Sequence, residues 1–274
     1  MQPKVGIISA MGIHSLVTIT DKSPICERCN NKLKESYFPW LREGYKYIWK
    51  CENPECKNQD AEEEIRIDKE KKDEDARQAL ITMKDDFLKQ PTKIMGEMGV
   101  PIKYHNVSLD SFKGGEKYVQ AIRNYLSEPN GSLYIYGNCG SGKTHLAVSI
   151  LRELYLANVT LKAGFIPTPN LLLQIRDCFN KDPKFTEYEI VEKYLNYHVL
   201  VLDDMGAEKT TEFSITTLYL IINGRLSDEK PTIVTSNLSR KQFETQIDNR
   251  IASRFAEYKA IHLDMPDHRK NSYA

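Results

Sequence analysis

From residue 119 onward, short apolar runs alternate with stretches whose apolar residues recur at helical spacing. The runs predict buried strands at Leu133–Tyr136, Leu161–Ile166, His198–Met205 and Pro231–Leu238. The helical stretches lie around these strands, at 119–126, 146–154, 170–179, 188–197 and 215–226. Strands that alternate with helices in this way predict an α/β domain. We expect a mainly parallel sheet, covered on both faces, that binds ligands at the carboxyl ends of its strands.

The segment before this domain has a different pattern. From Lys57 to Lys89 both charges are densely mixed, apolar positions are few, and Gly and Pro are absent. Such a pattern is typical of a solvated helix or a flexible connector. We therefore predict three parts: a small N-terminal domain at 1–60, a charged helical linker at 61–98 and the α/β domain at 99–274.

Composition and charge narrow the function classes. Lys plus Arg and Asp plus Glu both number 38, so the net charge is zero and any nucleic-acid surface must be local. No run reaches the roughly 18 apolar residues that span a bilayer, so no membrane role is expected. The apolar stretch at 5–19 is interrupted by His14 and lacks a small-residue cleavage site, which favours cytoplasmic structure over a signal peptide.

The N-terminal part holds four of the six cysteines. Cys26 and Cys29 form a C-x-x-C pair, and Cys51 and Cys56 form a looser pair around Pro54. Two thiolate pairs of this kind can complete a tetrahedral Zn²⁺ site, and the metal would stabilise a domain too small for a large core. We expect structural zinc, because four thiolates leave no open coordination position for catalysis. Buried or redox-active thiols are the alternative.

Aromatic residues are concentrated between the two cysteine pairs. They are Tyr37, Phe38, Trp40, Tyr45, Tyr47 and Trp49. The simplest interpretation is a small core around the metal. A docking face for a protein partner, or a platform on which bases stack, remains the alternative.

The strongest chemical signal is the stretch GNCGSGKT at Gly137–Thr144, which fits G-x-x-x-x-G-K-[ST]. It joins a predicted strand to a predicted helix, and this context argues against a chance glycine-rich turn. Its residues are the predicted nucleotide-binding set: Gly137, Asn138, Cys139, Gly140, Ser141, Gly142, Lys143 and Thr144. Backbone N–H groups would cradle a polyphosphate, Lys143 would neutralise the β- and γ-phosphates, and the Thr144 hydroxyl would ligate Mg²⁺.

Two later strands end in polar residues that complete an ATPase site. HVLVLDDM, at 198–205, places Asp203 in the Mg²⁺ shell beside Thr144 and Asp204 where a hydrolytic water must be oriented. In PTIVTSNL, at 231–238, the Asn237 amide is placed to hold that water or to sense the γ-phosphate. Each feature alone is also compatible with an ordinary polar turn.

With DNRIASRF at 248–255 the accumulated pattern resembles the AAA+ ATPases of the DnaC, DnaI and IstB group, from about Gly99 onward. In that group GNCGSGKT resembles Walker A, VLVLDDMGAE Walker B and IVTSN sensor 1. RIASRF is similar to the box that carries the arginine finger. The resemblance therefore implies that Arg254 is a finger, supported by Arg250, that acts on the ATP of a neighbouring subunit. It also implies self-association.

The resemblance further implies a segment that grips single-stranded DNA between 170 and 197, where Arg176, Lys181, Lys184 and Lys193 could contact phosphates. The chain departs from the group's pattern in three places. Asp204 stands where many AAA+ proteins have Glu, and Cys139 is an unusual residue within the loop. The sequence also ends soon after Arg254, so we expect no full helical lid and assign no role to Arg269.

The resemblance implies an ATP-dependent loader of the hexameric replicative DNA helicase, of bacterial or phage type, with slow ATP hydrolysis used as a switch. The zinc-bearing domain would hold the helicase. Three alternatives remain open: a transposition helper that assembles on duplex DNA, a P-loop kinase whose arginine acts within a monomer, and a binding module in which ATP only locks a conformation.

Overall fold

The computed structural model describes residues 5–10, 13–18, 25, 29–32, 34–37, 47–50, 52–113, 115–179, 185–207 and 211–268. Contacts within the chain divide it into two units, Met1–Ile81 and Thr82–Ala274. Some residues singled out from the sequence lie outside the described residues: Cys26, Phe38, Trp40, Tyr45, Cys51, Lys181, Lys184 and Arg269.

The first unit contains a small sheet of four strands. They are β1 (Val5–Ala10), β2 (Ile13–Thr18), β3 (Lys34–Tyr37) and β4 (Tyr47–Lys50). Their order is β2-β1-β4-β3, with β1 and β4 parallel and the outer pairs antiparallel. An antiparallel bridge between Ile25 and Lys32 closes the turn that carries Cys29, and Asn30 in this turn has a positive φ of 59°. The strands β3 and β4 include part of the aromatic-rich stretch.

A single helix, α1 (Pro54–Lys89), covers most of the charged segment. Among its described side chains Cys56 and Phe87 are the buried ones, and Phe87 belongs to the second unit. Its ion pairs are exposed, as in the contact of 2.6 Å between Lys72 and Asp68, and such pairs stabilise a helix by only a few tenths of a kcal/mol. No helix in the described part of the chain combines the length and apolarity needed to cross a bilayer.

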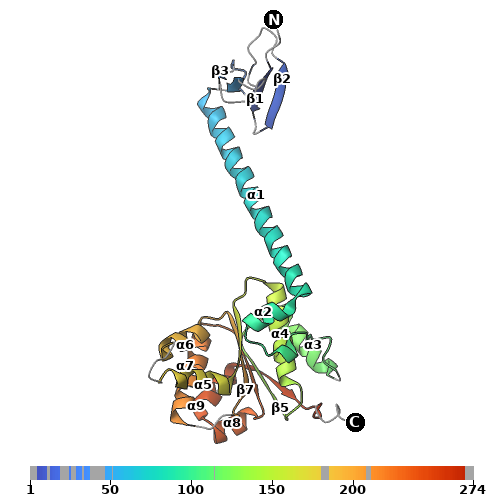
Figure 1. Cartoon of the computed structure of the whole chain (residues 1–274), viewed down its shortest axis with the longest axis vertical. Coiled ribbons are helices and arrows are strands. Elements are labelled where there is room, and N and C mark those ends of the chain that lie inside the picture. The colour runs from blue at the N-terminus through green and yellow to red at the C-terminus, as the bar shows by residue number, and fades with distance from the viewer. Residues whose placement is uncertain are drawn as a thin grey trace. The chain divides into compact units, whose positions relative to one another are not determined.

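The second unit is built on a five-stranded sheet (Figure 1). Its strands are β5 (Leu133–Gly137), β6 (Ala163–Pro167), β7 (Val199–Met205), β8 (Thr232–Ser236) and β9 (Lys259–Leu263). The order is β6-β7-β8-β5-β9, and all neighbours pair in parallel. The predicted parallel sheet is therefore confirmed. The strand β9 was not predicted, because it is a largely exposed edge strand without a continuous apolar run.

Alternate residues of β5, β6, β7 and β8 enter two separate cores, as the period of two in a strand requires. Leu133 and Ile135 of β5 pack with α3 (Glu116–Ser127) and α4 (Lys143–Ala157). Tyr134 faces the opposite core, which is formed with five helices. These are α5 (Thr168–Asp177), α6 (Glu187–Leu195), α7 (Glu212–Ser227), α8 (Arg240–Gln246) and α9 (Asn249–Arg254). Helices thus cover both faces of the sheet (Figure 1).

Two short helices, α8 and α9, were absent from the sequence prediction, and α2 (Pro91–Glu97) was not separated from the predicted helical linker at 61–98. Each has seven residues or fewer. A helix this short completes about two turns, which is too little for apolar periodicity to identify it. Their ends nevertheless follow local rules: Pro91 opens α2, Ser239 forms a capping box at α8, and Asp248 caps α9 by accepting hydrogen bonds from two backbone N–H groups.

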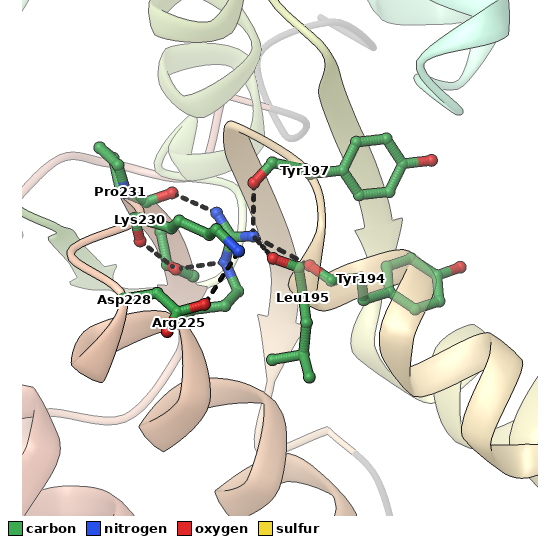
Figure 2. A network of polar contacts seen from close by, with 8 residues as sticks. Tyr194, Leu195, Tyr197, Arg225, Asp228, Lys230 and Pro231 are labelled. Atoms are coloured by element: carbon green, nitrogen blue, oxygen red, sulfur yellow. Dashed lines mark hydrogen bonds and ion pairs between the residues drawn. The ribbon is translucent and has the colours of Figure 1, made fainter.

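A fully buried arginine joins α6, α7 and β8 at the edge of the sheet where the strands begin. Figure 2 shows the guanidinium of Arg225, from α7, surrounded by oxygen atoms. It donates hydrogen bonds of 2.7–3.3 Å to the carbonyls of Tyr194, Leu195, Tyr197 and Pro231 and to the hydroxyl of Thr232. Carbonyls at a helix C-terminus lack partners within the helix, and Arg225 supplies them at the end of α6. Burial lowers the pKa of Arg225 to about 10, so it stays charged at neutral pH.

We predict that Arg225→Met destabilises the second unit by about 3 kcal/mol, because buried carbonyls lose their donors. Arg225→Lys should recover only part of this loss, since an ammonium cannot reproduce the planar fork. Denaturant unfolding followed by circular dichroism measures the effect. The matched control is Arg123→Met, which removes an exposed ion pair with Asp110 and should cost less than about 1 kcal/mol. Equal midpoints for the Arg225 and Arg123 variants would contradict the assignment.

Candidate active site

The glycine-rich stretch forms the loop between β5 and α4, as predicted. Gly142 precedes α4 with a φ of 90°, a conformation that L side chains rarely adopt. A Cβ atom there would also lie 2.7 Å from Cε2 of Phe112. On the same loop Gly140 has a φ of 75°, and its carbonyl accepts a hydrogen bond of 3.1 Å from the backbone of His268. The segment that follows β9 therefore contacts the loop.

Lys143, at the start of α4, is 7% exposed, and its ammonium is surrounded by oxygen atoms. Nζ donates to the carbonyls of Gly137 and Asn138, at 2.9 and 2.8 Å, and to Oδ1 of Asn237 at 2.7 Å. Two of these acceptors belong to the loop, and the third follows β8. The ammonium is thus held at the centre of the loop with all three of its N–H donors directed at oxygens.

Asp203 and Thr144 are in direct contact, as the sequence predicted. The Thr144 hydroxyl lies 2.9 and 3.1 Å from the two carboxylate oxygens of Asp203, and the Thr235 hydroxyl donates to Oδ1 at 2.7 Å. Burial raises the pKa of Asp203, although the hydrogen bonds from Thr235 and Thr144 oppose this effect. A carboxylate beside a hydroxyl offers the hard oxygen ligands that Mg²⁺ prefers, so these residues fit the metal.

Asp204 lies at an irregularity in β7, where the pairing with β8 shifts between Leu202 and Met205. It has a φ of 54°, a left-handed conformation that Asp tolerates better than most residues. Its backbone N–H donates to the Thr235 hydroxyl at 2.8 Å, and its Oδ1 accepts from Nδ2 of Asn237 at 3.1 Å. The bulge directs the two neighbouring carboxylates to different partners.

Asn237 therefore connects the glycine-rich loop to the end of β7. Its Oδ1 accepts from Lys143 and its Nδ2 donates to Asp204. The connection depends on strand order, because β8 lies between β5 and β7 and ends at the same edge of the sheet. The structure thus brings together the predicted residues Lys143, Thr144, Asp203, Asp204 and Asn237.

A cavity of about 430 Å³ opens at this edge. Besides the predicted residues and Thr235, which lies in the predicted strand at 231–238, it is lined by Pro101, Lys103, Tyr104, His145 and Pro167, which were not predicted as site residues. The first three belong to or precede a short 3-10 helix, η1 (Ile102–Tyr104), and Pro167 ends β6. Burial lowers the pKa of His145, so its ring is neutral at pH 7. Only Pro167 had a signal in the sequence, as it follows a predicted strand.

Arg250 and Arg254 both lie on α9 and line a second hollow of about 310 Å³ with Tyr219, Asn249 and Ser253. This hollow shares no lining residue with the cavity at the glycine-rich loop. Among the described contacts of Arg254 are Tyr219, at 3.3 Å, and Glu257, at 3.9 Å. Arg254 therefore does not line the cavity at the glycine-rich loop of its own chain.

Residues 112–261 match the family described as the bacterial DnaA ATPase domain. The chain belongs to this family. The match covers more than half of the sequence and includes the glycine-rich loop, both aspartates, Asn237 and Arg254. The predicted membership in the AAA+ ATPases is confirmed, and the family relation supports ATPase activity that uses ATP and Mg²⁺ in general terms.

Similar proteins agree with this family assignment. The replicative helicase loader DnaC of Buchnera aphidicola subsp. Acyrthosiphon pisum is 24% identical over 169 residues, which cover 59% of this chain and 68% of that protein. A crystal structure of the DnaC helicase loader is similar with a TM-score of 0.54 and 23% identity, over 60% of this chain and all of that one. AMPPCP-bound DnaA from Aquifex aeolicus gives a TM-score of 0.51 and 20% identity, over 61% of this chain and 53% of that one.

These structural similarities establish the fold, an α/β AAA+ domain with a parallel sheet, as the sequence predicted.

The predicted four-cysteine zinc site lies in the first unit, outside this domain. Cys29 is partly buried and Cys56, in the first turn of α1, is buried, whereas Cys26 and Cys51 lie outside the described residues. In the described ranges no three His, Cys, Asp or Glu side chains are grouped as metal ligands. Zinc binding therefore stays a prediction in this DnaA-type ATPase.

The buried charge of Asp203 leads to a prediction about stability. Because burial raises its pKa, the ionised carboxylate destabilises the folded domain at neutral pH, and the penalty disappears as pH falls below the unfolded pKa of about 4. Asp203→Asn should therefore raise the melting temperature of the nucleotide-free protein at pH 7, and the gain should shrink as the pH is lowered toward 4.

The same variant should lose the additional stabilisation by Mg²⁺ and ATP. Thermal melting with and without Mg-ATP tests both effects, and a lower melting temperature at pH 7 without nucleotide would contradict the reasoning.

Proposed function

We propose that the protein is an ATP-dependent loader of the hexameric replicative DNA helicase onto single-stranded DNA, acting in the cytoplasm. The observation that carries the proposal is the similarity of 59% of the chain to a DnaC helicase loader, together with the convergence of Lys143, Thr144, Asp203, Asp204 and Asn237 at one edge of the sheet. ATP serves as a conformational switch, and its hydrolysis is slow and regulated by the partner.

ATP binding is assigned to the glycine-rich loop and Lys143. A phosphate oxygen would take the place of one of the oxygens that now accept hydrogen bonds from Nζ. Thr144 and Asp203 would hold Mg²⁺, which neutralises phosphate charge when it is bound. Pro101 and Tyr104 line the same cavity and offer apolar surface for the rest of the nucleotide.

Hydrolysis is assigned to Asp204 and Asn237. Asp204 is the less buried of the two aspartates, and its carboxylate faces the Asn237 amide. A water held between these groups would be oriented by Asn237 and would give its proton to Asp204. Asn237 also contacts Lys143, so the same amide would respond to a phosphate bound at the ammonium.

Arg254 is assigned to the ATP of a neighbouring subunit. The observation that favours this role is the separation of its hollow from the chain's own nucleotide cavity, with no lining residue in common. A kinase with an arginine acting in cis would require Arg254 at its own cavity. A finger that acts between subunits makes self-association part of the mechanism, because it stabilises charge on the phosphates in the transition state.

Single-stranded DNA is assigned to the surface around α5 and α6. Arg176 and Lys193 are exposed on these helices, and Phe179, Phe185 and Tyr188 are exposed near them at 65%, 59% and 72%. Proteins that bind single strands combine two kinds of side chain. Cations contact the phosphates, and aromatic rings stack on the bases. The surface is consistent with this role although the chain as a whole has no net charge.

Helicase binding is assigned to the N-terminal unit, stabilised by Zn²⁺ on Cys26, Cys29, Cys51 and Cys56. Two local features support the zinc proposal. The bridge between Ile25 and Lys32 closes a turn that contains Cys29, and Cys56 is buried at the start of α1. Short turns and a helix N-terminus are frequent positions for structural zinc ligands.

The helicase assignment is tested by native mass spectrometry of the protein mixed with the hexameric replicative helicase of its host. We expect a complex with the wild-type protein and zinc in its mass, and loss of both with Cys26→Ser. Lys143→Ala is the matched control, because it should remove ATP binding and leave the zinc unit intact. Without a helicase complex under any nucleotide condition the loader proposal fails. Stimulation of hydrolysis by duplex DNA alone would favour the transposition helper.

Asp204→Asn should lower the rate of ATP hydrolysis at least about 100-fold, because the amide cannot accept the proton of the attacking water. ATP binding should remain, since the change leaves Lys143, Thr144 and Asp203 in place. Phosphate release and nucleotide binding are measured separately, in the presence of helicase and single-stranded DNA. Wild-type turnover in this variant would exclude Asp204 as the base, and an inactive wild-type protein would favour the ATP-locked binding module.

A further inference from the structure

The hollow on α9 contains a tyrosine whose role is not explained by the nucleotide site. Tyr219 lies on α7, half-buried, and its ring is flanked by both arginines of α9. The guanidinium carbon of Arg250 is 5.5 Å from the ring centroid and that of Arg254 is 5.9 Å away. At these distances both cations are attracted to the π system of the ring. One aromatic side chain thus organises two positive charges.

Arg254 and Arg250 have different polar partners, and Arg254 is the one that contacts the Tyr219 hydroxyl. Its Nη2 donates to the Tyr219 hydroxyl at 3.3 Å, and Nη1 lies 3.9 Å from Glu257. Arg250 is instead paired with Asp248, the capping residue of α9, at 3.3 Å. Each arginine therefore has its own carboxylate, and the Tyr219 hydroxyl selects Arg254.

The contacts of Arg254 do not use all of the N–H donors of its guanidinium. Its Nε is buried and has no hydrogen-bond acceptor among the described residues. Its side chain is 35% exposed, and the contact with Glu257 is longer than a hydrogen bond. A guanidinium in this condition retains N–H donors for an oxygen that arrives from outside the subunit.

We propose that Tyr219 is a positioning residue that holds the Arg254 guanidinium in place for the ATP of a neighbouring subunit. The inference rests on the proposed finger role of Arg254 and adds the residue that directs it. The ring restricts the guanidinium from one side and the hydroxyl fixes its Nη2 end. The long, flexible Arg254 side chain is therefore already restricted before it contacts the neighbouring phosphates, so the contact costs less conformational entropy.

The test uses mixed subunits, so that each site receives its finger from a defined partner. Lys143→Ala donates a finger but cannot use ATP, whereas Arg254→Ala can use ATP but donates no finger. Mixing the two, with helicase and single-stranded DNA present, should restore hydrolysis at the mixed interface. Tyr219→Ala is then added either to the finger donor or to the finger acceptor, and folding of each variant is checked by thermal melting.

We expect kcat to fall about tenfold when Tyr219→Ala is on the donor, with KM for ATP unchanged, because a finger acts in the transition state. The acceptor arm should lose much less. Tyr219→Phe on the donor keeps the ring and should recover most of the rate, leaving a deficit of about threefold from the missing hydroxyl.

Each other outcome overturns the inference in a distinguishable way. Equal losses in the donor and acceptor arms would show that Tyr219 supports the fold rather than the finger. Equal rates in all Tyr219 variants would show that Arg254 needs no positioning by the tyrosine. If the parent mixture itself shows no restored hydrolysis while the wild-type protein is active, the finger role in the proposed function fails, and the role of Tyr219 fails with it.

Discussion

The amide of Asn237 is the contact on which the arrangement of the site depends, because it joins Lys143 on one side to Asp204 on the other. That contact is possible only because β8 lies between β5 and β7 and all three strands end at one edge. The parallel pairing brings the loop after β5, the aspartates of β7 and the amide after β8 to the same level. Chemistry far apart in sequence thus converges without long loops.

Sequence reasoning worked where one element carries its own signal. The continuous apolar runs of β5, β7 and β8 predicted buried strands. The glycine-rich motif after β5 pointed to Lys143, and the polar residues at the ends of the next two runs pointed to Asp203 and Asn237. It failed where the signal depends on partners distant in the chain. The edge strand β9 is too exposed to show an apolar run, and Tyr104 and Tyr219 acquire meaning only from the cavity and the arginines that the fold places beside them.

The two edges of the sheet also differ in what they contribute to stability. At the nucleotide edge Asp203 is buried as a carboxylate with a raised pKa, and Asp204 has a left-handed backbone. Both features cost free energy and are typical of functional sites. At the opposite edge Arg225 satisfies carbonyls of α6 and of the segment that precedes β8. The hydrogen bonds of Arg225 thus hold the segments that precede β7 and β8, the strands whose other ends form the site.

The same helix α7 carries both Arg225 and Tyr219, and this connects the scaffold to the proposed finger, Arg254. Arg225 anchors α7 to the start of β8, and Tyr219 presents its ring to the arginines of α9. A helix fixed in this way cannot rotate without breaking buried hydrogen bonds, so the ring is a rigid reference for Arg254. The proposed role of Arg254 on another subunit would need such rigid placement, because Arg254 does not line the chain's own cavity at the glycine-rich loop.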